Sequence, residues 1–546
     1  MTRKRTVSAK SCLTRRDFLR AAGVGAGYVL ARQPLGAWDV AAGPAGDTLV
    51  AGFSFDIKTL DPGRQLENGT NNVGHATYDS LVTFDGEDLK TPLPSLATSW
   101  KASPDGKTHI FTLRRNVRFA SGNPVTSADV KWSFDRVRYI KGNAAFLLDG
   151  VQTVAAPDPY TVVIQLDAPR PALLPILSSP VLGAVDSKLV MQNGGDASPD
   201  AKEKDKAEAY LNAHSAGSGP YALESYTPNQ EIVLVKNPTH WRGAPPISRI
   251  VIRNIQEPAT EELMLKKGDL DVVWGIGPDE ARSLRTASGV TVKTTPALNL
   301  LYVIMNNNPG VGGPFSNPKV QQAVRYAIDY NGILALAGPG SVRLTGVIPT
   351  NLPGALPSSD AVKTDLDRAR QLLKEANVGE LKGQLSFSTG RIFYGVNFGV
   401  VAEKVQADLA KVGIRLELDG LPSSVALQKY RDAKNQLGIW AWAADYPDVS
   451  DYLVFVPGRT VAKRAGWPAD AGPQAQELAQ LAAKAETEAD TAKRISLYQQ
   501  VNRKIAEIGP YVPLFQPVAP YAYRSNLRGV SLAATWFVDY MAVRKT

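Results

Sequence analysis

Apolar residues recur along this chain with the two periods that mark strands and helices. Residues 109–114 (His-Ile-Phe-Thr-Leu-Arg) alternate apolar and polar side chains, which predicts a half-buried strand. Thr126 and Asp129 have the spacing of a capping box. Val130, Phe134 and Val137 follow at helical spacing, so the pattern predicts a helix that begins directly after Thr126.

Comparable patterns cover the rest of the chain. They predict strands over residues 232–235, 250–252 and 414–418, helices over 365–376 and 401–412, a helix stop at Gly413, a long helical region over 473–508, and an exposed charged loop with a short helix over 196–208. Helices and strands are interspersed throughout, which favours lobes of mixed α/β type. The 546 residues are enough for about three or four structural units.

A weakly apolar run of 11 residues, 21–31, stands near the N-terminus. It is about half as long as the ~20 residues that cross a bilayer, so we interpret it as the core of an export signal. No later segment approaches ~18 apolar residues, and the exported product is expected to be soluble.

Charge is concentrated in the same segment. The whole chain carries a net charge of +9, but residues 1–37 hold eight basic residues and one acid, so about +2 remains on the rest. A disordered basic tail that binds nucleic acid is the alternative interpretation of this segment. The nearly neutral remainder predicts no nucleic acid partner.

Arg15 and Arg16, followed by Phe18, Leu19 and Arg20, resemble a twin-arginine export signal. Cleavage is expected after Ala37 or after Ala42, and we assign residues 1–37 to the signal. The only cysteine, Cys12, would leave with it, and a chain without cysteine suits an oxidising compartment. These features predict export through the twin-arginine machinery to a bacterial periplasm.

The sequence contains none of the enzyme signatures that we sought. A Walker A loop, a dinucleotide fingerprint, a G-x-S-x-G elbow and an H-E-x-x-H pair are all absent. The four histidines, His75, His109, His214 and His240, are isolated from one another. We therefore expect no catalytic residues, no metal site and no cofactor, and the balance moves from catalysis toward binding.

Several blocks carry a resemblance that extends in order over the whole mature chain. They include Leu96-Ala97-Thr98-Ser99-Trp100, Ser103-Pro104-Asp105-Gly106-Lys107, Gly122-Asn123-Pro124-Val125-Thr126-Ser127-Ala128-Asp129, Gly217-Ser218-Gly219-Pro220-Tyr221, Lys267-Gly268-Asp269-Leu270-Asp271 and Trp442-Ala443-Ala444-Asp445-Tyr446. This set closely resembles the family 5 (peptide/nickel type) solute-binding proteins of ABC importers. Most of these blocks are turns or core stripes, so we assign ligand contacts only to the last.

The resemblance implies an α/β, two-lobed periplasmic-binding-protein-like fold of class II type, with an extra domain on lobe I. The implied division is lobe I over 47–77, 219–293 and 506–546, the extra domain over 78–218, and lobe II over 294–505. It also implies a receptor, not an enzyme, whose partners are a membrane permease and its ATPase subunits. We expect a monomer.

Asp445 is the first candidate for ligand contact, because an apolar run ends there in one carboxylate flanked by the aromatic residues Trp442 and Tyr446. Such a carboxylate can bind a ligand ammonium while the aromatic rings pack on the ligand. In peptide-binding members of the family, the matching aspartate holds the α-amino group of the peptide. The alternative is a strand-end carboxylate that caps the turn before Pro447.

Arg391 is the candidate for the peptide carboxylate, because dipeptide-binding relatives place an arginine near this position. A surface arginine without a ligand is the alternative. Tyr394 belongs to the same segment, and Tyr302 and Asn306 are further candidates for lining the cleft. Short peptides are the first ligand class, followed by opines or other amino-acid conjugates, by oligosaccharides, and by nickel or haem. An exported hydrolase is the alternative of a different class.

Overall fold

The computed structural model describes residues 47–546, except 87, 391, 534 and 536. The predicted export signal, with Cys12, Arg15 and Arg16, lies outside these residues, as does Arg391. Within the described part of the chain, no helix is long and apolar enough to span a bilayer.

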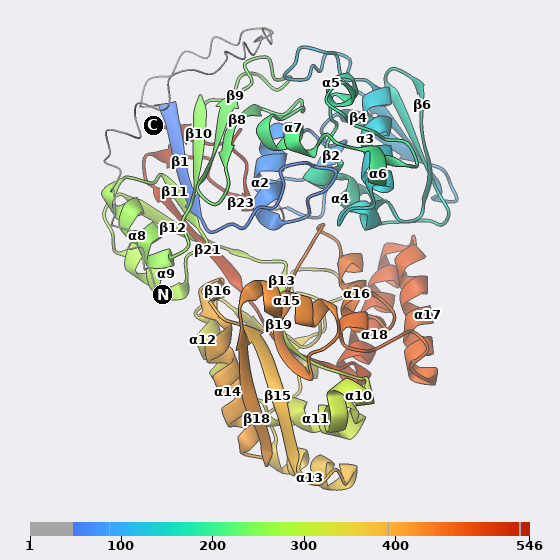
Figure 1. The fold of residues 1–546 in the computed structure, drawn as a ribbon, viewed down its shortest axis with the longest axis vertical. Helices are drawn as coiled ribbons and strands as arrows, with labels where there is room; N and C mark the ends of the chain where they lie inside the picture. The colour runs from blue at the N-terminus through green and yellow to red at the C-terminus, as the bar shows by residue number, and fades with distance from the viewer. Residues whose placement is uncertain (1–46, 87, 391, 534, 536) are drawn as a thin grey trace, which may run out of the picture. The chain divides into compact units, whose positions relative to one another are not determined.

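A mixed sheet of seven strands forms the core of lobe I (Figure 1). Its strands, in spatial order, are β12 (Val290–Pro296), β21 (Val518–Arg524), β11 (Val272–Trp274), β1 (Thr48–Phe53), β10 (Arg249–Asn254), β9 (Glu231–Lys236) and β8 (Tyr221–Thr227). The predicted strands at 232–235 and 250–252 are confirmed, and they pair antiparallel with Ile250 opposite Leu234. Helices of lobe I are α2 (Asn68–Thr77), α8 (Pro258–Lys267) and α9 (Pro278–Arg285).

A second sheet, of six strands, forms the core of lobe II. Its order is β14 (Val342–Arg343), β20 (Tyr511–Gln516), β13 (Asn299–Met305), β19 (Leu437–Ala443), β15 (Leu381–Ser388) and β18 (Ile414–Leu421). Its helices are α10 (Pro309–Gly312), α11 (Pro318–Ala327), α12 (Tyr330–Ala337), α13 (Leu366–Ala376), α14 (Phe398–Ala410), α15 (Ser423–Arg431), α16 (Thr460–Arg464), α17 (Pro473–Thr487) and α18 (Thr491–Ile508).

Both faces of this second sheet are covered, which explains why β13 is apolar at nearly every position. Leu301, Val303 and Met305 point into the core that α11, α13 and α14 complete. Leu300 and Tyr302 point to the opposite core, which contains residues of α17 and α18. Successive strand residues alternate between faces, so a strand buried on both sides is an almost continuous apolar run.

Two neighbouring crossings connect the sheets. The chain passes from β12 to β13 at residues 297–298 and returns from β20 to β21 at Pro517, and Figure 1 shows β21 (red) as a strand of the first sheet. The Ala297 N–H donates to the Pro517 carbonyl over 3.2 Å, so the crossings lie side by side. Because β20 pairs with β13, the return to lobe I comes later than the predicted boundary at 505/506.

The extra domain has its own sheet and its own core. The sheet order is β4 (Ala97–Ala102), β5 (Thr108–Leu113), β7 (Thr161–Leu166) and β6 (Val151–Asp158), and the helices are α3 (Ser127–Ile140), α4 (Leu173–Leu177), α5 (Ser187–Gln192), α6 (Ala201–Lys204) and α7 (Glu208–Ala213). The predicted strand at 109–114 and the helix after Thr126 are both confirmed, including the capping box with Asp129.

Four further strand pairs are short: β2 (Val82–Thr83) with β3 (Leu93–Pro94), β16 (Ile392–Phe393) with β17 (Val396–Asn397), β22 (Leu527–Arg528) with β25 (Arg544–Lys545), and β23 (Leu532–Ala533) with β24 (Phe537–Val538).

The chain enters and leaves the extra domain at one point, where the Gly219 N–H donates to the Thr77 carbonyl over 3.1 Å. A Cβ on Gly217 would lie 1.9 Å from the Thr77 oxygen, so this glycine serves the close approach of the two segments.

The other predictions hold with three differences. Helices over 365–376 and 401–412 are confirmed as α13 and α14, and α14 begins three residues earlier than expected, at Phe398. The helical region over 473–508 consists of two helices, because the chain breaks before Asp490, which caps α18. The charged stretch over 196–208 contains α6, and its Asp205 is buried instead of exposed.

Asp205 is buried because Arg136 of α3 compensates its charge. The Arg136 guanidinium donates two hydrogen bonds to Asp61, at 2.6 and 2.7 Å, and two to Asp205, both at 2.8 Å. All three side chains are at most 2% exposed. This ion-pair network ties the segment after β1 to the extra domain.

Candidate functional site

A cavity of about 680 Å³ lies between the extra domain and lobe II. The extra domain contributes Phe146, Asp149 and Arg170 to its wall. Lobe II contributes the end of β19 and the short 3₁₀ helix that follows it, Val449–Phe455. Three of the predicted ligand contacts, Trp442, Asp445 and Tyr446, therefore line one cavity.

Asp445 occupies the second position after β19 and is half-buried. Its backbone N–H donates to Asp451 Oδ2 over 3.0 Å, and Trp442 Nε1 donates to the same oxygen over 3.3 Å. Of the residues that the structure describes, none hydrogen-bonds to the Asp445 carboxylate. Asp451 therefore orients the backbone and the indole, and the Asp445 carboxylate is left available to a ligand.

Burial controls the protonation of both carboxyl groups. It raises the pKa of Asp445 to about 7, while the neighbouring Arg464 guanidinium acts in the opposite direction. Burial also raises the pKa of Asp451 well above its usual range, and the charge of Asp445 raises it further. Asp451 is the more deeply buried of the two, so the charge of the pair resides on Asp445.

Tyr446 connects the two sides of the cavity. It is 6% exposed, and its ring packs in the hydrophobic core of the extra domain although it belongs to lobe II. Its hydroxyl lies 3.2 Å from Ser450 Oγ. Trp442 is half-buried and packs at the edge of the lobe II core. The lobes are thus in contact beside Asp445.

Four arginines in the wall of this cavity were not anticipated from the sequence: Arg170, Arg431, Arg459 and Arg464. Arg170 donates to the carbonyls of Leu147 and Asp149, and Arg459 pairs with Glu486 at 2.8 Å. Arg431 and Arg464 form no ion pair with any described residue. No spacing in the sequence signals this group, because Arg170, Arg431 and the α16 pair Arg459 and Arg464 come from three separate segments.

Tyr394 lines a second cavity, of about 360 Å³, that also lies between the lobes. Its ring packs against the cores of both lobes, and its backbone has φ +50°. A tyrosine in the left-handed region is uncommon, so the hairpin of β16 and β17 holds it there. The neighbouring candidate Arg391 lies outside the described residues and stays a prediction.

The structure places Tyr302 and Asn306 away from both cavities. Tyr302 is fully buried, and its hydroxyl lies 2.7 Å from the Tyr430 hydroxyl. The Asn306 amide donates to the carbonyls of Ala433 and Asn435. Their polar groups are engaged within lobe II, so neither residue enters the candidate site.

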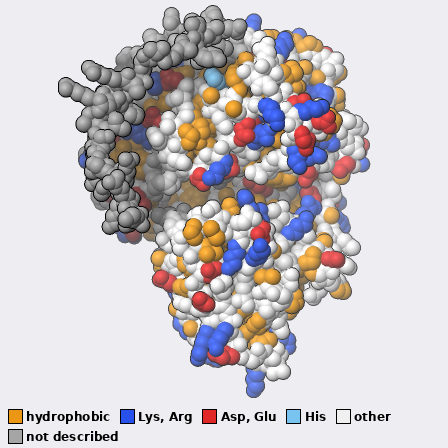
Figure 2. Space-filling view, in the orientation of Figure 1, with side chains coloured by type: hydrophobic (Ala, Val, Ile, Leu, Met, Phe, Trp, Pro, Cys, Tyr) orange, Lys and Arg blue, Asp and Glu red, His pale blue; other side chains and the backbone are white. Residues whose placement is uncertain are grey.

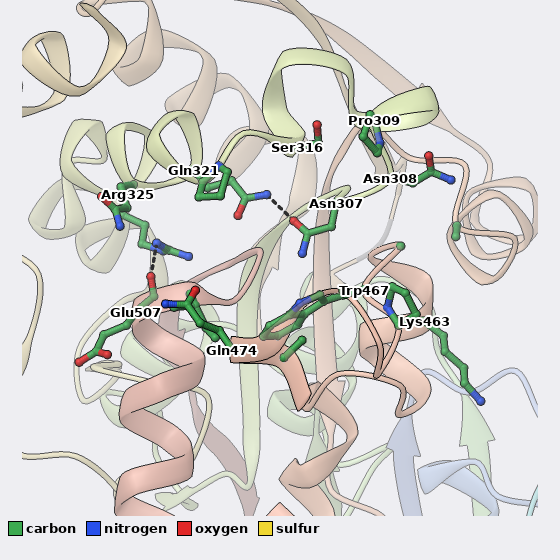
Figure 3. Close-up of a pocket in the computed structure, with 18 residues that line it drawn as sticks. Asn307, Asn308, Pro309, Ser316, Gln321, Arg325, Lys463, Trp467, Gln474 and Glu507 are labelled. Atoms are coloured by element: carbon green, nitrogen blue, oxygen red, sulfur yellow. Dashed lines mark hydrogen bonds between the residues drawn. The ribbon is translucent and has the colours of Figure 1, made fainter. Parts of the chain in front are cut away.

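A third cavity, of about 800 Å³, lies within lobe II and is lined by neither Asp445 nor Tyr394 (Figure 3). Arg325, in its wall, donates to the carbonyls of Glu507, Gly509 and Tyr511 and so caps the end of α18. Gln321 Nε2 donates to Asn307 Oδ1 over 2.6 Å. These groups are satisfied within the protein, which makes this cavity a weaker candidate for ligand binding.

Two further features of the described residues bear on function: the metal-ligating side chains and the surface charge. Among them, no group of three or more His, Cys, Asp and Glu side chains could hold a metal ion. On the face shown in Figure 2, Lys and Arg side chains are mixed with Asp and Glu over both lobes. A field of one sign, as nucleic acid binding uses, is not visible on that face.

Comparison with known proteins assigns the chain to a family. The sequence profile of the bacterial extracellular solute-binding proteins, family 5 (middle region), matches residues 91–461. The chain belongs to this family. This solute-binding protein is 28% identical over 489 residues to the probable D,D-dipeptide-binding periplasmic protein DdpA of Escherichia coli K12, covering 88% of this chain and 91% of the relative. It is 25% identical to di/tripeptide-binding protein 2 of Pseudomonas aeruginosa UCBPP-PA14, covering 89% and 92%.

Solved structures share the two-lobed α/β fold of this solute-binding protein. A dipeptide-binding protein of Pseudoalteromonas sp. SM9913 in complex with Met-Leu has a TM-score of 0.79 at 21% identity, covering 91% of this chain and all of that one (100%). The binding protein MoaA of A. tumefaciens R10 in complex with mannopinic acid has a TM-score of 0.78 at 23% identity, covering 92% and 100%. The fold expected from the sequence is therefore confirmed.

Proposed function

We propose that this solute-binding protein is the exported receptor of an ABC importer and that it captures a short peptide between its lobes. The observation that carries the proposal is the Asp445 carboxylate, which lines an interlobe cavity and accepts no hydrogen bond from a described residue. A peptide ammonium would pair with it in a charge-assisted hydrogen bond. Arg431 and Arg464 supply guanidinium groups for the peptide carboxylate.

The proposed mechanism is capture and delivery without turnover. Ligand bound at Asp445 would be enclosed as the crossings at 297–298 and 517 let the lobes close. Exclusion of water strengthens the ion pair, because the effective dielectric constant falls. A membrane permease would then bind both lobes of the closed form, and ATP would be hydrolysed on separate subunits. Export by the twin-arginine route to the periplasm and a monomeric state are part of the proposal.

An opine or another amino-acid conjugate is the second candidate ligand. Such a molecule also carries an amine and a carboxylate, so it would use Asp445 and the same arginines. A neutral oligosaccharide has no charged group that could pair with Asp445 or with the arginines. The charges in the cavity therefore support zwitterionic ligands over sugars.

A ligand screen tests the proposal directly. We expect thermal-shift and equilibrium-dialysis measurements to show stabilisation of the mature chain by dipeptides or tripeptides, and no consumption of the bound peptide. The increase in stability follows from binding to the folded state alone. N-acetylated peptides serve as matched controls and should bind poorly, because they lack the ammonium. Equal stabilisation by a neutral sugar would contradict the proposal.

The affinity for peptides is expected to be highest between about pH 7 and pH 8. The carboxylate of Asp445 must be ionised to pair with an ammonium, and its pKa is raised to about 7. Affinity should therefore fall about tenfold per unit as the pH drops below 7, and fall again above about 8 as the peptide amine loses its proton. Dialysis from pH 5 to pH 9 measures this profile. An affinity that stays constant down to pH 5 would argue against Asp445 as the anchor.

A further inference from the structure

The second interlobe cavity, of about 360 Å³, contains a carboxyl group that has no partner among the described residues. Glu261 lies on α8 of lobe I and is only 2% exposed. No described residue donates a hydrogen bond to its buried Oε2 atom, and no described cation forms an ion pair with the side chain. An unpaired buried carboxyl destabilises a fold relative to an apolar residue of similar size. Folding alone therefore does not explain this residue.

Aromatic rings from both lobes form the walls around Glu261. Phe53 and Trp274 of lobe I stack with ring centroids 4.7 Å apart. Phe393 and Tyr394 of lobe II meet edge to face at 5.0 Å. Aromatic faces and a single carboxylate together are the usual surroundings of a bound organic cation. A neutral apolar group would pack against the same aromatic walls but would leave the Glu261 carboxyl unpaired.

The two interlobe cavities adjoin at one residue. Ala443, the last residue of β19, lines both the cavity of Asp445 and that of Glu261. Asn299, opposite Ala443 in the sheet, also lines the Glu261 cavity. A ligand anchored at Asp445 can therefore extend past the end of β19 toward Glu261.

We propose that Glu261 is a second anchoring residue of the ligand cleft and selects ligands with a cationic side group, an alkylammonium or a guanidinium. This inference rests on the proposed function, since it places the backbone of the same peptide at Asp445. The cationic group enters the aromatic cavity and donates to Glu261 Oε2. Burial raises the pKa of Glu261 to about 9, and the Glu280 carboxylate contributes to the increase. The group is thus protonated before the cation arrives and releases its proton on binding.

Other titratable groups near Glu261 do not replace it. The Glu280 carboxylate accepts from the Gly277 N–H at the start of α9, over 3.0 Å. Glu262, the next residue on α8, pairs with Lys266 and accepts from Ser283 Oγ. Tyr394 lines the cavity, and burial raises the pKa of its phenol, so it stays neutral. The free carboxyl in this cavity is that of Glu261.

The test compares dipeptides that differ only in a side-chain charge. Lys-Ala and Ala-Lys are measured against Nle-Ala and Ala-Nle by calorimetry at pH 7.5, since the norleucine side chain is apolar and of similar length. In the wild type, at least one lysine peptide should bind about tenfold tighter than its norleucine partner. It should also release about one more proton, measured in two buffers of different ionisation enthalpy.

Glu261→Gln keeps the shape of the side chain and should reduce the lysine preference and the extra proton release to near zero. Glu262→Gln, on the same helix but outside the cavity, should retain both. Thermal melting of each variant verifies that it is folded. Equal binding of lysine and norleucine peptides by the wild type would overturn the inference and leave the proposed function intact. A lysine preference that survives Glu261→Gln would also overturn it. Binding of none of the four peptides would reject the peptide receptor and this inference together.

Discussion

Asp445→Asn is expected to weaken peptide binding by about a hundredfold or more, the effect of removing one charge from a desolvated ion pair. The carboxylate lines the interlobe cavity and has no hydrogen-bond donor from the described residues, so its charge is available to the ligand. Asparagine has nearly the same shape, and it leaves the backbone contact with Asp451 in place. Calorimetric titration with the best peptide from the screen measures the loss.

Two controls distinguish the loss of this charge from a loss of folding. Asp470→Asn changes an exposed aspartate of lobe II and should leave the affinity unchanged. The melting temperature of Asp445→Asn without ligand should not fall, since the variant removes a half-buried charge. The variant should also lose the acid limb of the pH profile. Wild-type affinity in Asp445→Asn would show that the ligand amine binds elsewhere.

Arg136→Met is expected to destabilise the protein by about 3 kcal/mol, because only the partly exposed Arg64 then remains as a counter-ion for the two buried carboxylates of Asp61 and Asp205. Arg136 makes four hydrogen bonds, two to Asp61 and two to Asp205, and the side chains of these three residues are at most 2% exposed. Urea unfolding monitored by tryptophan fluorescence measures the change. Arg138→Met, on the same helix but with a bond to an exposed carbonyl, should lose less than about 1 kcal/mol.

The difference in unfolding free energy between the wild type and Arg136→Met should change with pH in a defined direction. Ion pairing lowers the pKa of Asp205 in the folded protein, so the network stabilises the wild type above the ordinary pKa of about 3.9. That stabilisation is lost as the pH falls through the lowered folded pKa. In Arg136→Met, Asp205 keeps only Arg64 as an ion-pair partner and accepts a proton more readily, so the difference in unfolding free energy between the two proteins should narrow toward pH 4. A gap that widens on acidification would contradict this account.

Local patterns in the sequence predicted many of the elements correctly. The alternation over 109–114 and the capping box at Thr126 depend only on neighbouring residues, and both are present in the structure. The region over 473–508 was predicted as one because both helices share the same composition, and the break depends on the cap at Asp490. Asp205 was expected on an exposed loop, because its partner Arg136 is 69 residues away in the chain.

The candidate site shows the same division. The sequence by itself determined that an apolar strand ends in Asp445 between aromatic residues, because these residues are contiguous. Only the tertiary structure placed Arg431 and Arg464 in the same cavity and Glu261 in the neighbouring one. The tertiary structure also buries Tyr302 in a core of lobe II, because what packs against each face of β13 decides which of its residues are buried. Periodicity is a short-range property of the chain, whereas the convergence of charges from three segments depends on how two sheets and their crossings are arranged.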